Sequence, residues 1–269
     1  AEPGRPATDW GTLDDGVTTS ALHFFLDLYE ATEDPQDLAA AESVGRFLLD
    51  AQYPSGGWPQ RYPAGSDYLR NITRNDNVMA NAIESLLRLH HITGKDEYVN
   101  AAVRGGECLL ELQGPEGEAI WAQQYDPDTL EPAAARRFEP VGYTPNESIE
   151  VMGILLTLYR VTDDARFLDA VGRALDWYEA NKPEDGLYAR LYEPGTGRRI
   201  YGLEEGGMTY VREEARGGYA WEGRWYPERV AMHWRELAQG IDEGGVPRHQ
   251  QPALVRMGMG MAGNLRRAH

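Results

Sequence analysis

The sequence predicts an all-α fold, an (α/α) toroid built from repeated helix hairpins. Three segments of the chain share one layout: a short polar cluster, a helix, a polar turn, a second helix and a loop that carries aromatic residues. No strand-rich region separates these segments. Because each helix pair buries its apolar face against its neighbours, repeated pairs stack into a curved array or a closed ring.

The first helix of each segment is recognised by the spacing of its apolar residues. Residues three and four positions apart lie on one face of a helix, so such a stripe marks the face toward the core. Pro35 and Gly94 mark the turns after the first two of these helices, and Thr18, Asn75 and Asn146 are expected in the cap regions at their starts. The three stripes are Leu22, Phe25, Leu26 and Tyr29; Val78, Ala82, Leu86 and Leu89; and Met152, Leu155, Leu156 and Tyr159.

The chain is interpreted as one toroid domain over residues 1–269. Residues 1–10 form an N-terminal extension, and residues 224–269 form a C-terminal region with no recognised match. The start is polar and rich in proline, without the apolar segment of a signal peptide. This start is interpreted as that of a mature chain after cleavage, or as a boundary at which the sequence was cut. The expectation is a secreted, extracellular bacterial protein whose signal peptide is not part of this chain. The single cysteine, Cys108, allows no internal disulfide and is expected in the core.

The charge of the chain restricts its partners. The net charge is −17, which excludes a nucleic-acid partner, since binding to phosphates needs a basic surface. No run of eighteen apolar residues is present, so no membrane span is predicted. Arginine supplies almost all the positive charge, because Lys95 and Lys182 are the only lysines. An arginine-lined cleft could hold carboxylates, since the planar guanidinium bonds both oxygens, although a bias toward arginine also follows from genome composition.

Polar clusters precede the first helix of each segment: Asp14 with Asp15, residues 75–77, and Asn146 with Glu147. A ring would bring these helix starts, and the loops after the second helices, to one end of its axis. Each cluster alone is explained by helix capping. Three clusters at one end also suit calcium, which prefers carboxylate and amide oxygens.

The loops of the predicted cleft end carry aromatic residues and arginines. The stretch GGWPQRYP (residues 56–63) offers Trp58 as a flat face for sugar stacking, or alternatively as a side chain that fills the core. Arg136 and Arg137 lie in AAARRFEP, and Arg190 lies in GLYARLYEPGTG. A surface salt bridge is the default interpretation of any one arginine.

Together these stretches resemble the catalytic modules of family 10 pectate lyases over roughly residues 11–223. The motifs that carry the resemblance, in family order, are TLDDGVTT, GGWPQRYP with NITRNDNVM, IWAQQYDPDTLEPAAARRFEP, GLYARLYEPGTGRRIYG and RGGYAWEG. The resemblance implies an (α/α) toroid that cleaves polygalacturonate, pectin or a related uronate polymer by calcium-assisted β-elimination. Its partner would be an acidic plant polysaccharide, and the protein is expected to be a monomer.

The resemblance also implies roles for individual residues. Asp14 and Asp76 would hold calcium or a substrate carboxylate, Arg136 would be the base that removes the C5 proton, and Arg190 would bind a uronate carboxylate. An arginine base would need a crowded cationic setting, since guanidinium is normally protonated. The other predicted substrate-binding residues are Trp58, Arg61, Asn75, Arg137 and Tyr125.

The chain departs from the family pattern at three places in the predicted cleft. Asn77 stands where the family usually has a second acid, residues 144–146 replace a Ser-Gly segment, and Glu204 and Glu205 occupy a loop that usually supplies an arginine. The family's N-terminal helix and first Gly-Gly-Trp-Pro motif are missing from the chain. Two alternatives therefore stay open: a weak or inactive homologue that binds acidic glycans, and an (α/α)-toroid glycoside hydrolase with a pair of carboxylates.

Overall fold

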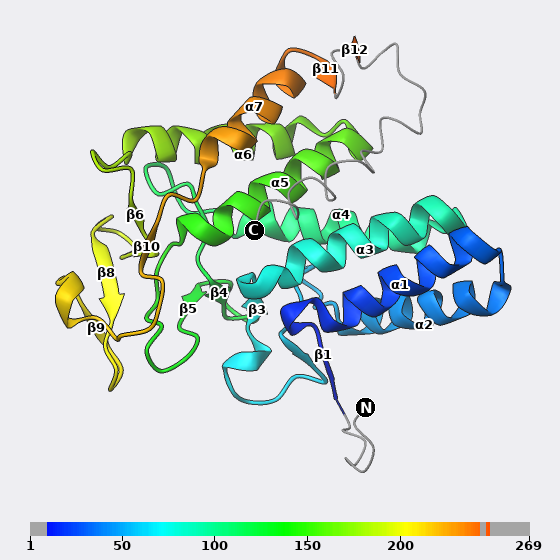
Figure 1. The fold of residues 1–269 in the computed structure, drawn as a ribbon, viewed down its shortest axis with the longest axis horizontal. Coiled ribbons are helices and arrows are strands. Elements are labelled where there is room, and N and C mark those ends of the chain that lie inside the picture. The colour runs from blue at the N-terminus through cyan, green and yellow to red at the C-terminus, as the bar shows by residue number, and fades with distance from the viewer. Residues whose placement is uncertain (1–9, 243–245, 248–269) are drawn as a thin grey trace.

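The computed structural model describes residues 10–242 and 246–247, and most of this part of the chain is helical. Three antiparallel hairpins stack side by side, and the helix α7 packs against the third of them (Figure 1). The first helices contact each other in the order α1, α3, α5, so they form one continuous layer. The predicted all-helical (α/α) fold is therefore confirmed. The helices are α1 (Val17–Thr32), α2 (Pro35–Ala51), α3 (Val78–Thr93), α4 (Asp96–Glu111), α5 (Pro145–Thr162), α6 (Ala165–Ala180) and α7 (Pro227–Ala238).

The turn within each hairpin follows one rule: a residue in the left-handed conformation ends the first helix, and an extended residue starts the second. Gly94 has a φ of 68° and ends α3, whereas Glu33 and Asp163 adopt the same conformation after α1 and α5. Asp34 and Asp164 then cap α2 and α6 by accepting hydrogen bonds from backbone N–H groups two residues later. The turns therefore lie where the sequence placed them.

The starts of the first helices differ from the prediction. The residues directly before α1, α3 and α5 are Gly16, Asn77 and Thr144, not Thr18, Asn75 and Asn146. The hydroxyl of Thr18, for example, donates to the carbonyl of Thr12 instead of capping a helix N–H. At the first two starts the chain turns through a short 3-10 segment, which shifts the helix beyond the polar cluster.

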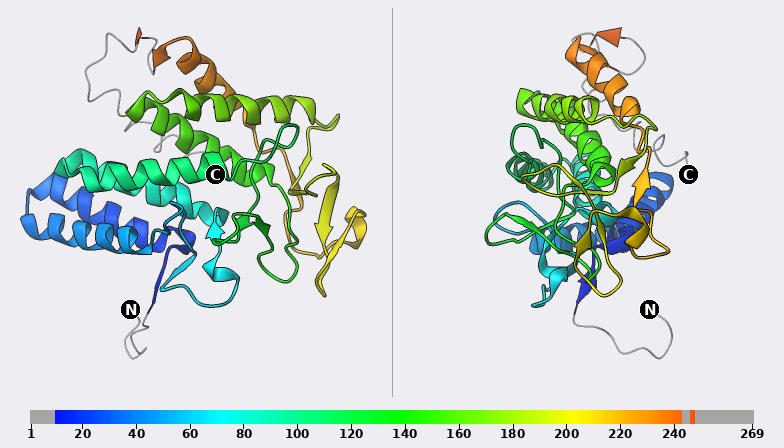
Figure 2. Two further views of the ribbon diagram at one scale, coloured as in Figure 1. Left: turned by 180° about the vertical axis from the view of Figure 1, so that it is seen from behind. Right: turned by 90° about the vertical axis from the view of Figure 1, so that its left-hand side faces the viewer.

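Except for the last pair, which follows α7, the short strands join the loops at the end of the array where the first helices begin (Figure 2). Each pairing is antiparallel, so these strands tie neighbouring loops together rather than form a continuous sheet. The pairs are β1 (Gly11–Thr12) with β2 (Arg61–Tyr62); β4 (Gln124–Tyr125) with β3 (Ile72–Thr73) and β5 (Pro132–Ala133); β8 (Arg199–Gly202) with β7 (Leu191–Tyr192) and β9 (Met208–Thr209); β6 (Tyr188–Ala189) with β10 (Glu222–Gly223); and β11 (Ile241–Asp242) with β12 (Val246–Pro247). The 3-10 helices are η1 (Asp14–Gly16), η2 (Tyr68–Arg70), η3 (Asn75–Asn77) and η4 (Arg212–Glu214).

One aromatic residue in the loop after each hairpin fills the core. Trp58 and Trp121 are fully buried, and their Nε1 atoms donate to the carbonyls of Leu48 (2.8 Å) and Leu109 (2.7 Å). Tyr188 occupies the corresponding place in the third loop and donates to a carbonyl in the same way. Each ring stabilises the end of its own second helix, because it satisfies a carbonyl that the helix leaves unpaired.

Two predicted substrate-binding residues belong to this core, and the prediction is corrected for both. Trp58 is inaccessible to a sugar because no part of its ring reaches the surface. Tyr125 is 1% exposed, and its hydroxyl donates to the carbonyl of Leu112 at 2.7 Å. The alternative interpretation of Trp58, a side chain that fills the core, is the one the structure supports. Cys108 is buried in the core as expected.

None of the helices within residues 10–242 combines the length and the apolar character that a membrane crossing requires. Residues 1–9 of the predicted N-terminal extension, and residues 243–245 and 248–269 of the predicted C-terminal region, lie outside the described part of the chain.

Candidate functional site

Three carboxylates from two repeats meet at the cleft end of the array. The side chains of Asp14, Asp15 and Asp76 each place an oxygen within 4.8 Å of the others. They come together because η1 and η3, the turns before α1 and α3, contact each other. Asp15 and Asp76 occupy equivalent positions in these turns, with φ angles of 51° and 53°, and each is followed by a second left-handed residue. This backbone conformation is rare for residues other than glycine. It directs the two acids away from the N-terminus of the following helix, which they would otherwise cap.

The cluster is electrostatically unstable as three bare anions. The pKa of Asp76 is raised from its ordinary 3.8 to about 6, first by burial and then by the neighbouring charges of Asp14 and Asp15. Arg136 acts in the opposite direction and lowers it. The cluster therefore favours a proton or a cation between its oxygens.

The residues around the cluster fit a calcium ion. Asn75 is 6% exposed, and its Oδ1 atom has no hydrogen-bond partner among the described residues. Gln60 is 4% exposed; its Nε2 donates to Asp14 at 3.2 Å, and its Oε1 is likewise without a partner there. Buried amide oxygens without partners carry a desolvation penalty unless a ligand or water reaches them. Several carboxylate and amide oxygens at one place form the donor set that calcium prefers.

Sequence reasoning selected Asp14 and Asp76 as metal ligands and left out Asp15. The signal that would have identified it is the repeat itself. Aligning Val17 with Val78, the first residues of α1 and α3, places Asp15 rather than Asp14 opposite Asp76.

Arg136 faces this cluster from the loop after β5. Its Nε atom lies 3.6 Å from Oε2 of Glu139, and its side chain is 47% exposed. Burial alone would lower the pKa of Arg136, but the carboxylate of Glu139, with smaller contributions that include Asp76, raises it above its ordinary value. Arg136 is therefore protonated in the ligand-free protein. Its acidic neighbours are the reverse of the cationic setting that a base role was expected to need.

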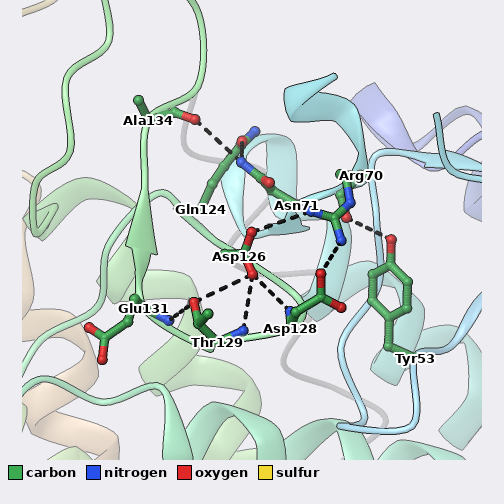
Figure 3. A network of polar contacts seen from close by, with 9 residues as sticks. All are labelled: Tyr53, Arg70, Asn71, Gln124, Asp126, Asp128, Thr129, Glu131 and Ala134. Carbon is green, nitrogen blue, oxygen red and sulfur yellow. Dashed lines mark hydrogen bonds and ion pairs between the residues drawn. The ribbon is translucent and has the colours of Figure 1, made fainter. Parts of the chain in front are cut away.

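A polar network holds the loop that carries Arg136 (Figure 3). The side-chain amide of Asn71 donates to Oε1 of Gln124 (3.0 Å) and to the carbonyl of Ala134 (3.3 Å), two residues before Arg136. Arg70 joins the same network through Asp126 and Asp128, at 3.3 and 2.5 Å. These contacts attach the segment that leads to Arg136 to residues 70 and 71 of the first-repeat loop.

Arg190 lies at the same end of the array but already has a carboxylate partner. Its Nη2 is 2.6 Å from Oε1 of Glu147, and its guanidinium lies 4.8 Å from the ring of Tyr219. Glu147 is 5% exposed and also accepts hydrogen bonds from Thr144 and Gln123. Glu147 is therefore committed to Arg190 instead of joining the acid cluster. The Nε atom of Arg190 is buried and has no hydrogen-bond partner among the described residues.

The other predicted arginines form the rim of the site. Arg61 is paired with Asp67 at 3.6 Å, and its guanidinium lies 5.1 Å from the ring of Trp10. Arg137 is 68% exposed and lies 3.5 Å from the carboxylate of Glu205.

Glu204 and Glu205, in the loop that differs from the family pattern, are both paired with arginines. Glu205 pairs with Arg137, and Glu204 lies 3.1 Å from Nε of Arg216. The guanidinium of Arg216 also stacks on Phe138 at 3.9 Å. Sequence reasoning missed Arg216, although its motif RGGYAWEG was recognised, because only the fold brings residue 216 next to residue 204.

Comparisons with known proteins agree with the helical fold described above. The sequence model of the family described as pectic acid lyase matches residues 3–201, whereas no curated protein sequence matches the chain. The family 10 polysaccharide lyase from Cellvibrio cellulosa is 21% identical, with a TM-score of 0.77 over 88% of this chain and 84% of that chain. A mutant of that enzyme in complex with trigalacturonic acid is 22% identical, with a TM-score of 0.75 over 90% and 85% of the two chains. The cellobiose 2-epimerase from Spirochaeta thermophila is 17% identical, with a TM-score of 0.54 over 89% and 65%.

Proposed function

We propose the reaction of this protein from one premise: the chain belongs to the pectic acid lyase family, and so is a polysaccharide lyase. The reaction that the site supports best is β-elimination on polygalacturonate or a closely related uronate polymer, assisted by calcium. The observation that carries this proposal is the acid cluster of Asp14, Asp15 and Asp76 facing Arg136. A structural relative holds trigalacturonic acid, which supports the same substrate class here.

The acid cluster would hold calcium with oxygens of Asp14, Asp15 and Asp76, and with the unpartnered amide oxygen of Asn75. When bound, calcium supplies positive charge that neutralises the uronate carboxylate and makes the neighbouring C5 proton more acidic. Arg190, whose side chain is 15% exposed, would bind a uronate carboxylate from the other side. Charge placed in advance at these points stabilises the enolate-like state more than the ground state.

Arg136 would remove the C5 proton. The electron pair of the C5–H bond then forms the C4–C5 double bond, the bond from C4 to the glycosidic oxygen breaks, and that oxygen takes a proton from water. Arg136 must first lose a proton, and the carboxylates of Glu139 and Asp76 oppose that loss. We therefore expect activity to rise toward alkaline pH.

The ion pairs of Glu204 and Glu205 affect the substrate preference that we expect. Glu204 and Glu205 alone would repel a fully de-esterified chain. Because Arg216 and Arg137 offset them, we expect weakened rather than abolished activity on such a chain, and a relative preference for partly methylated pectin.

The test is incubation with polygalacturonate and calcium, followed by the ultraviolet absorbance of the unsaturated uronate. We expect product with calcium and none after chelation. Binding of the polymer without unsaturated product would support the alternative of an inactive glycan-binding homologue. Secretion and a monomeric state remain proposals, which a secretion assay in the source organism and sedimentation would test.

A glycoside hydrolase is the second candidate, and one observation favours it. Asp76 has its pKa raised to about 6 beside the carboxylate of Asp14, and a hydrolase needs one carboxyl group that stays protonated beside one that is ionised. A hydrolase would release saturated sugars with a new reducing end. The same incubation, analysed for both saturated and unsaturated products, separates the two reactions.

A further inference from the structure

We propose that Glu139 is a positioning residue that fixes Arg136 for proton removal, an inference that rests on the proposed function. Glu139 is 1% exposed. Its Oε2 accepts a hydrogen bond from the backbone N–H of Arg136 at 3.1 Å and lies 3.6 Å from the Nε of the same residue. One carboxylate oxygen thus accepts a hydrogen bond from the main chain of the arginine and forms an ion pair with its guanidinium.

This arrangement determines which part of Arg136 can reach a ligand. The guanidinium atom closest to Glu139 is Nε, so the carboxylate does not occupy the two terminal amino groups as its nearest partners. A long, partly exposed side chain loses much rotamer freedom when it is ordered. Glu139 imposes that order before the substrate arrives, which lowers the entropic barrier to a productive geometry.

The second oxygen of Glu139 connects Arg136 to the other arginine of the site. Oε1 accepts a hydrogen bond from the hydroxyl of Tyr219 at 2.5 Å, and the ring of Tyr219 lies 4.8 Å from the guanidinium of Arg190. Phe138 packs edge-on against the same ring at 5.3 Å. The buried carboxylate therefore sets the distance between the base candidate and the aromatic ring beside Arg190.

The experiment compares Glu139→Gln with Arg136→Lys and with the double variant. Glutamine keeps the size of the side chain and one acceptor oxygen, which can serve either the backbone N–H of Arg136 or the hydroxyl of Tyr219, but it loses the charge that orients the guanidinium. Loss of the Glu139 charge alone would ease the deprotonation of Arg136 and raise kcat. We nevertheless expect the kcat for unsaturated product to fall about tenfold or more with KM nearly unchanged, because alignment in the reacting complex is lost. The double variant should be no slower than Arg136→Lys alone, since Glu139 acts through Arg136. Glu131→Gln, an exposed acid in the same loop, is the matched control and should leave kcat unchanged.

The outcomes separate this inference from the proposed function. If Arg136→Lys is impaired while Glu139→Gln keeps the wild-type kcat, Glu139 does not position Arg136. If the double variant multiplies the two single losses, Glu139 acts independently and the inference is equally overturned. If the wild type yields no unsaturated product, the proposed function itself is wrong. Should Glu139→Gln not fold, Glu139→Asp keeps the charge with a shorter reach; a reduced kcat is expected, and a wild-type kcat would overturn the inference.

Discussion

Replacing Asp76 with asparagine should stabilise the calcium-free protein and weaken its binding of calcium. The substitution fits the backbone, because asparagine tolerates the left-handed conformation that residue 76 adopts at a φ of 53°. It removes one of three carboxylates whose oxygens lie within 4.8 Å of one another. The protein therefore loses repulsion when the site is empty and loses a ligand when calcium is bound.

The magnitude follows from the titration of Asp76. Its pKa rises from 3.8 to about 6 in the folded protein, with burial as the largest cause and the charge of Asp14 next. A shift of about 2 units corresponds to about 3 kcal/mol. Neighbouring atoms desolvate the carboxyl group, yet the residue as a whole is exposed and solvent screens its charge, so we expect about 1 kcal/mol. The raised pKa means that the ionised form is penalised in the folded state. The penalty is small near pH 4 and complete above about pH 6, so Asp76→Asn should gain stability at pH 8 and little at pH 4.

Urea unfolding at both pH values, with a chelator present, measures this gain. Asp169→Asn is the control, because it removes one negative charge from an exposed position on α6. Titration with calcium at pH 8 should then show a higher dissociation constant for Asp76→Asn than for the control variant. Equal stability of the two variants at pH 8, or an unchanged calcium affinity of Asp76→Asn, would refute the electrostatic account of the cluster.

Three further predictions concern Arg136, Glu204 and Trp58. Arg136→Lys keeps the charge but loses the planar fork, so kcat should fall far more than affinity, and the wild-type rate should rise toward alkaline pH because the pKa of Arg136 is raised; a flat pH–rate profile would contradict the base role. Glu204→Gln frees Arg216 from its carboxylate partner and should lower KM for de-esterified pectate, whereas an unchanged KM would mean that Arg216 does not contact substrate. Trp58→Ala should destabilise the fold by about 3–5 kcal/mol in urea unfolding, as removal of a fully buried aromatic residue does, and a stable variant with raised KM would instead restore the stacking role.

The hairpin array could be predicted from sequence because its signals are local. The apolar stripes, and turn residues such as Gly94, depend on neighbours within one or two helical turns, and the structure reproduces them. The convergence of the helix starts at one end also followed from the repeat. The exact starts could not be derived, because the 3-10 turns at η1 and η3 arise from contacts between the two turns.

Side-chain roles were harder to predict because they depend on burial. Trp58 and Tyr125 have the chemistry of sugar platforms, yet both rings close the end of a hairpin. The repeat contained a signal for this, since an aromatic residue recurs at the equivalent place in all three loops, and a recurring structural position favours a shared structural role. Pairs such as Glu204 with Arg216 carry no sequence signal, because they form between loops whose approach only the fold determines.

The site arises where the third repeat departs from the first two. Counting back fifteen residues from the ends of the first helices, at Thr32, Thr93 and Thr162, places Val17, Val78 and Glu147 at equivalent positions. In the first two repeats the chain reaches this position through a left-handed turn that directs Asp15 and Asp76 into the acid cluster.

In the third repeat α5 begins two residues earlier, at Pro145, so the turn and its acid are absent and Glu147 is buried within the helix. The following loops change in step: Gln60 and Gln123 correspond to Arg190, whose charge Glu147 balances at 2.6 Å. Neither change is favourable alone, because a buried Glu147 without Arg190, or a buried Arg190 without Glu147, would leave an uncompensated charge. The joint replacement by Glu147 and Arg190 therefore puts an arginine in the third repeat where the first two have acids. This end of the array then carries both the acids that would hold calcium and the arginine that would bind a carboxylate of the proposed uronate substrate.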